Sequence, residues 1–422
     1  MTAFLIFISL AIFASAGYVV WPSRYNIVTH LSVGANFIST FVPAVILTTQ
    51  DKYPQRDVDL YVSILTCGVI CFVIGLFIGF YIKPLRTKFT YDLFDDNVYN
   101  KRVIYITKIM LVIGIVFLII SYAGMGFIPA FAADPIAAKF FRGAYMAPYM
   151  RVAILFRSSF YILSTVIPIA CIIWYKTKSH SFLLLTLAAI TLLALSLARS
   201  PAFSGVVLAV AIVMSLKSKF HFKILMVIII FIYVFSSVFY YLIGAKQLDY
   251  SNFGTKHPYW EIVAGGSPDI EDQLQFLGRF QDNPKWTYGR TVYGGLIPGH
   301  YEWNPGVYTL NVIAPGLDID EAPSGGLRLP VAMWGYVCFE WIGVVLFCLI
   351  SGFFYGYFLR YTKTWMLNNS SILTKTVVIV LFNTLFANLF VFYTLSIYML
   401  PQVFILLFYI YRIRLFSGKP NI

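Results

Sequence analysis

The stretch VIYITKIMLVIGIVFLIISYAGM at residues 103–125 decides the fold class, because its 23 residues include a single charge, Lys108. A helix of this length measures about 35 Å, and the hydrocarbon core of a bilayer is about 30 Å thick. Comparable apolar stretches recur along the whole chain of 422 residues. We therefore expect an all-α polytopic membrane protein.

The composition agrees with this fold class. The chain is 59% hydrophobic and only 12% charged, whereas soluble domains carry about 25% charged residues. The net charge of +13 does not indicate nucleic acid, because no basic patch with interleaved aromatics lies outside the apolar stretches. The five cysteines fall inside apolar stretches at irregular spacing, which predicts neither a disulfide framework nor a zinc site.

The hydropathy pattern predicts eleven membrane spans. They lie near residues 3–22, 26–48, 60–82, 103–125, 152–175, 182–198, 202–216, 223–244, 331–359, 373–395 and 397–411. The sequence Ala14-Ser15-Ala16 is similar to a signal-peptide cleavage site, but no Lys or Arg precedes it. We therefore expect the first span to be retained.

The distribution of basic residues predicts the orientation of the spans. With the basic segments 83–102, 176–180, 217–223, 360–375 and 412–422 inside, the cytoplasmic side holds 18 Lys/Arg and 3 acidic residues. The opposite side then holds 13 Lys/Arg and 15 acidic residues. This excess of positive charge on one side is the usual bias of membrane proteins, and it places the C-terminus inside and the N-terminus outside.

The predicted spans divide the chain into three parts. Residues 1–244 form an N-terminal bundle of eight spans, residues 245–330 form a large outward loop, and residues 331–422 form a C-terminal bundle of three spans. A second outward segment covers residues 126–151. We expect any chemistry at the outer face, where both larger segments lie. The chain has no ATP-binding loop, so an energised pump is not expected.

Arg199 is the first candidate for binding an anion. Ser200 can cap the helix that follows, and Pro201 suits its first turn. Free amide groups and the positive end of the helix dipole would then lie beside the guanidinium. A helix over 202–216 is only about 22 Å long, so we expect its outer end to be recessed below the membrane surface. The alternative is an interfacial arginine that reaches the headgroups.

Two further charges lie inside predicted spans, where charge is costly and usually functional. Arg157 lies nearly two turns beyond Arg151 in the fifth span. Glu340 lies ten residues into the ninth span, and it is the one acid well inside a predicted span. The alternatives are that the two residues pair structurally, or that the ninth span begins later and Glu340 is interfacial.

The large outward loop supplies the remaining candidates. Arginines separated by glycines and aromatic residues can bind phosphate, glycines let the backbone approach a ligand, and aromatic faces suit sugar rings. Histidine and acidic residues of the loop can act as a general base. These candidates are Arg279, Arg290, Arg328 and Tyr293 for binding, and His300 and Glu321 for catalysis. For Arg279, the C-terminal end of a helix beginning near Ser267-Pro268-Asp269 is an alternative, structural role.

Asp57 and Asp59, in the short outward segment 49–59, are the acidic residues that a metal-dependent enzyme would use. They stand among Asp51, Lys52 and Arg56, so a solvated turn is the simpler expectation.

This arrangement resembles the O-antigen polymerase (Wzy) family. Its motifs include a Tyr-Gly-x-Thr run, an Ile-Pro pair, paired glycines, and a helix rich in glycine and aromatic residues. Here these are Tyr288-Gly289-Arg290-Thr291, Ile297-Pro298, Gly325-Gly326, and Trp334-Gly335 through Glu340-Trp341-Ile342-Gly343 to Gly352. The Leu-Ala-Arg-Ser run at 197–200 is similar to the segment that opens a mid-chain helix in the family. The chain departs from the family pattern at Tyr336 and Glu340, and it lacks Arg-x10-Gly repeats after Arg142, Arg290 and Arg328.

The resemblance implies a GT-C-like fold and a membrane glycosyltransferase in the bacterial inner membrane. Such enzymes join undecaprenyl-pyrophosphate-linked oligosaccharide repeat units on the periplasmic face, without a metal or another cofactor, and a chain-length regulator is a further partner. Arg199, Arg157 and Arg290 would contact the pyrophosphate, and Glu340, His300 or Glu321 would be the base. Three alternatives stay open: an O-antigen ligase, a lipid-linked oligosaccharide flippase or other transporter, and a metal-dependent glycosyltransferase.

Overall fold

The computed structural model describes residues 2–36, 53–82, 97–227, 269–297, 301–316, 326–367 and 371–386, together with residues 400, 402 and 404. Within these residues every regular element is a helix. Four helices are long and apolar enough to cross a membrane, judged by length and composition, and shorter apolar helices accompany them. The expectation of an all-α chain with the helices of a membrane protein is therefore confirmed at this coarser level.

The helices follow in chain order with short connections. The N-terminal set is α1 (Thr2–Ser15), α2 (Gly17–Val20), α3 (Ile27–Asn36), α5 (Gln55–Tyr81), α6 (Asn97–Met125), α9 (Ala153–Thr177), α10 (His180–Leu195) and α11 (Arg199–Lys217). The later long helices are α17 (Val331–Leu367) and α18 (Ile372–Phe386). The predicted outward segments contain the short helices α7 (Pro135–Phe140), α8 (Met146–Met150), α14 (Asp269–Asp282), α15 (Arg290–Gly294) and α16 (Pro305–Ile313).

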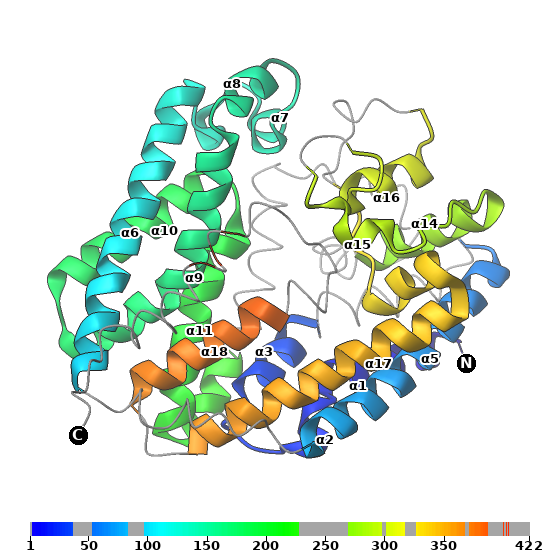
Figure 1. Ribbon diagram of the computed structural model, residues 1–422, viewed down its shortest axis with the longest axis horizontal. Helices are drawn as coiled ribbons and strands as arrows, with labels where there is room; N and C mark the ends of the chain where they lie inside the picture. The colour runs from blue at the N-terminus through cyan, green and yellow to red at the C-terminus, as the bar shows by residue number, and fades with distance from the viewer. Residues whose placement is uncertain are drawn as a thin grey trace, which may run out of the picture.

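Figure 1 shows two groups of long helices. One group consists of α6, α9, α10 and α11, and the other contains α1, α3, α5 and α17, with α18 in contact with both α9 and α17. Helices α7 and α8 lie at the top of the first group, and α14 to α16 lie at the top of the second. Both predicted outward segments therefore occupy the same side of the molecule.

The closest helix pair is α5 with α17, and glycines make it possible. Gly75 and Gly79 of α5 lie against the carbonyl groups of Leu349 and Phe353, and a Cβ at either glycine would overlap them. Gly352 and Gly356 of α17 lie in the same way against carbonyl groups of α5. Each helix thus carries a Gly-x-x-x-Gly motif at the contact, which lets membrane helices approach backbone to backbone.

These contacts also give the relative direction of the two helices. Residues 75 and 79 meet residues 349 and 353 in ascending order, so α5 and α17 are parallel. This agrees with the topology from the basic residues, in which both spans run from outside to inside. At the shared lower end, Arg360 donates to the carbonyl oxygens of Phe80 (2.9 Å) and Ile82 (2.8 Å). The cation thereby satisfies carbonyl groups that the end of α5 leaves unpaired.

Polar side chains are buried between the helices of this group. The Thr29 and Tyr355 hydroxyl groups are 2.8 Å apart, and Asn26 donates to the carbonyl oxygens of Gly17 and Trp21. Tyr18 contacts Nδ1 of His30, and Ser9 of α1 is 3.2 Å from Thr66 of α5. Such pairs stabilise helix contacts in an apolar environment, where an unpaired polar group is costly.

Several predicted boundaries are corrected by the structure. The predicted span 3–22 is two helices, because the chain bends at Ala16 between α1 and α2. The predicted span 60–82 begins at Gln55, so Asp57 and Asp59 lie in the first turns of α5 instead of a solvated turn. Most of the predicted spans at 223–244 and 397–411 lies outside the described residues.

The glycine contact predicts a large effect of added volume. We expect Gly79→Leu to lower the melting temperature of the purified protein, with a loss of about 1–3 kcal/mol in stability, because its Cβ would overlap the Phe353 carbonyl group. The control is Ile78→Leu, at an exposed position of the same helix. Equal melting temperatures for the two variants would show that the α5–α17 contact does not depend on the glycine.

Candidate functional site

A break in α17 forms the centre of the candidate site. Phe339 and Glu340 have non-helical backbone angles, with φ of −146° and 55° respectively. Gly335 and Gly343 lie against each other across this break, although eight residues of straight helix would separate them by about 12 Å. The chain therefore folds back, and the short arm Val331–Cys338 lies over the beginning of the long arm Trp341–Leu367.

The break changes the position expected for Glu340. The sequence predicted this residue ten positions into a continuous span, and that placement is wrong. Glu340 is exposed and lies at the turn where the long arm of α17 begins. The alternative in which the membrane-crossing helix begins later agrees with the structure. Positive φ is strained for a residue with a Cβ, and such strain is concentrated at functional sites.

The Tyr-Gly-Arg-Thr motif packs directly on the short arm of α17. The Thr287 amide donates to the Val337 carbonyl oxygen at 3.0 Å, and the Thr287 hydroxyl donates to Sγ of Cys338 at 3.0 Å. Gly289, with φ of 79°, lies against the Phe339 ring. Two motifs about 50 residues apart in sequence therefore meet at the break, and Gly289 supplies the positive φ that starts α15.

Arg290 is the exposed cation of this motif. It is the first residue of α15, and its guanidinium carbon lies 4.9 Å from the centre of the Trp303 ring. Lys285 also lies over Trp303, at 5.2 Å, and forms an ion pair with Glu302 at 3.6 Å. Within the described residues no carboxylate pairs with Arg290. A guanidinium held over an aromatic ring keeps its in-plane N–H donors for a ligand such as phosphate.

Aromatic residues join the loop helices to α17 beneath this surface. Trp286 lies 5.0 Å from Phe280 and 5.7 Å from Tyr336, and Tyr336 lies 5.7 Å from Trp341. Tyr308 of α16 donates to the Lys285 carbonyl oxygen, and its burial raises the pKa of its hydroxyl. These rings are mostly packing contacts, and the exposed aromatic side chains near the break are Tyr288, Tyr293, Phe339 and Trp341.

Arg157 is held by aromatic residues of the first outward segment. Its Nε donates to the Tyr149 hydroxyl at 2.7 Å, and its guanidinium lies over the rings of Tyr149 and Phe141 at 5.7 and 5.8 Å. Those two rings stack with centroids 3.7 Å apart. Arg157 is exposed near the start of α9, on the side of the molecule that carries α7 and α8.

Arg199 begins α11, but the predicted cap is wrong. Ala198 precedes the helix without a side-chain cap hydrogen bond, so Ser200 is the second helical residue. Leu197, with φ of 61°, turns the chain sharply between α10 and α11. Helix α11 has 19 residues and is about 28 Å long. The argument for a recessed tip, which depended on a short helix, therefore loses its basis.

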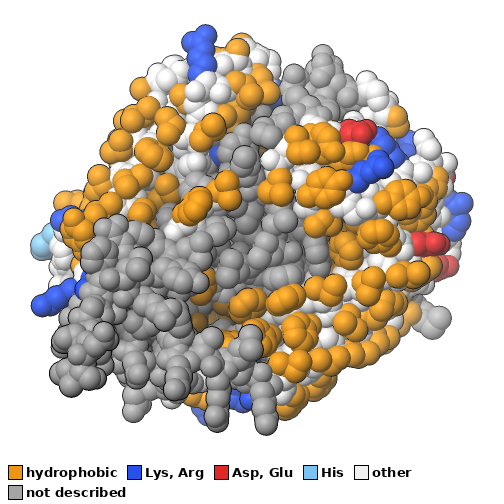
Figure 2. All heavy atoms as spheres, viewed as in Figure 1, with side chains coloured by type: hydrophobic (Ala, Val, Ile, Leu, Met, Phe, Trp, Pro, Cys, Tyr) orange, Lys and Arg blue, Asp and Glu red, His pale blue; other side chains and the backbone are white. Residues whose placement is uncertain are grey.

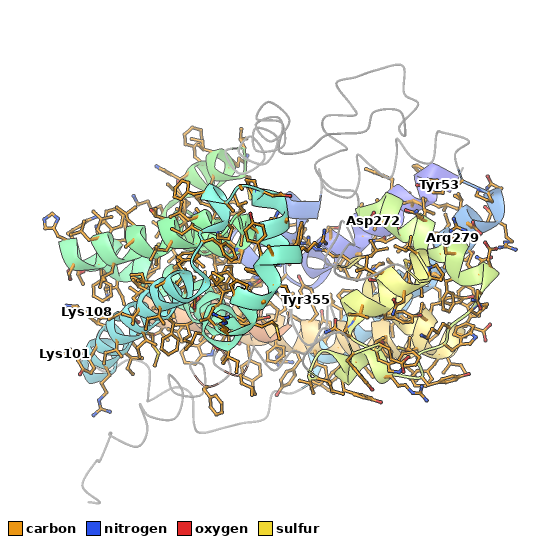
Figure 3. The ribbon with its side chains drawn as sticks, turned by 90° about the horizontal axis from the view of Figure 1, so that it is seen from above. Tyr53, Lys101, Lys108, Asp272, Arg279 and Tyr355 are labelled. Carbon is orange, nitrogen blue, oxygen red and sulfur yellow. The ribbon has the colours of Figure 1, made fainter. Side chains whose placement is uncertain are left out.

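The other loop candidates are separated from one another. Arg279 lies in the last turn of α14, which begins at Asp269 as predicted, and Figure 3 shows it in the same region as Tyr53 and Asp272, far from Lys101 and Lys108. Arg328 is exposed, and its carbonyl oxygen accepts from Gln273, which also accepts from the Tyr61 hydroxyl of α5. His300 and Glu321 lie outside the described residues.

Asp57 has a structural environment. Its side chain is buried, lies 3.5 Å from Arg56 Nε and contacts Gly278 of α14. Asp59 accepts from Gln55 at 2.8 Å. In the described part of the chain no group of three or more His, Cys, Asp or Glu residues lies together as a metal site would require.

No family model, curated protein or solved structure matches this chain. The functional argument therefore rests on the residues and their arrangement. The contributions of Lys285, Trp303 and Cys338 to the site were not expected from the sequence. Their spacing to Arg290 and Thr287 follows no helical or strand period, so only the folded loop relates them.

The strain at Glu340 can be measured. We expect Glu340→Gly to be more stable than Glu340→Ala by about 1–2 kcal/mol, because glycine adopts positive φ without the cost of a Cβ. Both variants remove the carboxylate, so a comparison of their melting temperatures isolates the backbone. A Glu340→Ala protein as stable as Glu340→Gly would contradict the strained turn.

Proposed function

We propose that this chain is a membrane glycosyltransferase that polymerises lipid-linked oligosaccharide repeat units. The observation that supports this most directly is the contact between the Tyr288–Thr291 motif and the break in α17. It gives one surface an exposed arginine and an exposed carboxylate, Arg290 and Glu340. The remainder of the proposal is an eleven-span topology in a bacterial inner membrane, with the break and α14 to α16 on the periplasmic side.

The proposed substrate is an oligosaccharide on undecaprenyl pyrophosphate. A hydroxyl group of the acceptor repeat unit attacks the anomeric carbon of the growing glycan. The bond from that carbon to the pyrophosphate oxygen breaks, and undecaprenyl pyrophosphate leaves. The hydroxyl proton passes to a base. No metal is required if cations stabilise the charge that develops on the leaving pyrophosphate.

Arg290 is our first candidate for the pyrophosphate contact, because it is exposed and oriented by Trp303. Arg157, Arg199, Arg279 and Arg328 remain candidates for further contacts along the substrate, and Tyr293 for stacking on a sugar. Glu340 is the candidate base within the described residues, and His300 and Glu321 are the alternatives outside them.

The proposal is tested by deleting the gene and examining the lipopolysaccharide ladder. A polymerase predicts a product with a single repeat in the deletion strain and a full ladder after complementation. Polymer that is built on the lipid carrier but not transferred to the core would indicate a ligase. Repeat units retained on the cytoplasmic face would indicate a flippase. Either of these results would overturn the proposal.

Substitution of Arg290 tests the site itself. We expect Arg290→Ala to reduce polymerisation at least 100-fold, because loss of one charge-stabilising contact in a transition state costs about 3 kcal/mol. Arg56→Ala is the control, since Arg56 is an exposed arginine near the same side that pairs only with Asp57 and Asp282 among the described residues. A full ladder from Arg290→Ala at normal protein level would exclude Arg290 from the reaction.

Metal dependence separates this proposal from the metal-dependent glycosyltransferases. We expect polymerisation by the purified protein to be unchanged by a chelator, because Asp57 is buried against α14 and unsuited to hold a catalytic ion. The assay compares initial rates with and without the chelator. Loss of activity that added Mg²⁺ or Mn²⁺ restores would contradict the proposed chemistry.

A further inference from the structure

The segment from Tyr288 to Ile297 exposes an unusual amount of apolar surface for a loop. The exposed fractions are 66% for Tyr288, 48% for Tyr293, 43% for Leu296 and 41% for Ile297. The opposite side of the segment is packed, with Thr291 near Cys338 and Gly294 against the Trp303 backbone. Helix α15 therefore has one face fixed to the protein and one apolar face with no partner among the described residues.

This apolar face continues onto α17. Gly289 lies against the Phe339 ring, and Phe339, Trp341 and Ile342 at the break are themselves exposed, Ile342 by 71%. Below them, Val345, Leu346 and Ile350 are exposed along the long arm. Figure 2 shows hydrophobic side chains over α17 and α5 and further up over the loop helices. The apolar side chains of the loop thus extend a surface that belongs to a membrane-crossing helix.

The length of α17 gives the depth of the break. Arg360 caps α5 at the lower end of the pair, and Lys363 lies over the ring of Phe80 there. These cations mark one boundary of the hydrocarbon layer. A core of about 30 Å requires about 20 helical residues, and counting 20 residues back from Arg360 reaches Glu340. The break, and the α15 segment packed on it, therefore lie at the opposite boundary.

We propose that the segment Tyr288–Ile297, together with Phe339, Trp341 and Ile342, is a membrane anchor that lies in the headgroup layer of the phospholipid leaflet on that side. Tyrosine and tryptophan are enriched at this depth, and a short helix with one apolar face lies flat there. Exposed apolar patches of this kind mark interaction surfaces. Arg290, beside the anchor, stands at the level of the phosphate groups.

The anchor is independent of the proposed enzyme activity, because it concerns the position of the segment relative to lipid. It can be tested by spin labelling of the full-length protein in phosphatidylcholine–phosphatidylglycerol vesicles. Nitroxides are placed by Tyr293→Cys and Leu296→Cys, with Asn283→Cys as the control. Asn283 is exposed in the connection between α14 and α15. The signal of the unsubstituted chain is subtracted, since the native cysteines also react.

The anchor predicts that labels at 293 and 296 collide more often with oxygen, and several-fold less often with a water-soluble nickel chelate, than the label at 283. Equal nickel accessibility at all three positions would place the segment in water and overturn the proposal. Low collision rates with both reagents at 293 and 296 would mean that protein covers the surface, which would also overturn it. None of these readings requires substrate or activity.

Discussion

The structure depends on backbone contacts that glycines permit along α17. Gly335 and Gly343 allow the chain to fold back on itself, and Gly352 and Gly356 allow the long arm to lie against α5 at backbone distance. A membrane offers little hydrophobic driving force between helices, so close packing and polar contacts must supply the stability. The same helix therefore determines the contact with the N-terminal bundle and the position of the loop helices.

The fold-back of α17 also explains how the loop is held. Its short arm is completely buried and presents the Val337 carbonyl oxygen and Cys338 thiol to Thr287. Aromatic rings from α14, α16 and α17 fill the space between these elements. The loop is thus an ordered cap on the end of α17, at least over α14, α15 and α16. Arg290 and Glu340 stand on the surface of this cap.

The two candidate arginines for which the structure describes the side chain, Arg290 and Arg157, are held in a similar way. Each lies over aromatic rings, Arg290 over Trp303 and Arg157 over Tyr149 and Phe141. Stacking restrains a guanidinium without neutralising it, whereas an ion pair would occupy its donors. This environment suits a group that binds an anionic substrate, and it gives a physical reason to test these residues ahead of arginines placed at helix ends.

The sequence by itself determined the helical class, the position of most long helices and their directions, because hydrophobic length and the placement of basic residues are local properties. The parallel packing of α5 and α17 agrees with the predicted directions, although the contacts that produce it join residues nearly 280 positions apart. Only the tertiary structure decided that α17 breaks at Glu340, that Asp57 is buried under α14, and that Arg290 lies over Trp303. Hydropathy does not detect a break inside an apolar run, because both arms remain apolar, and the fold-back becomes favourable only when α5 and the loop pack against it.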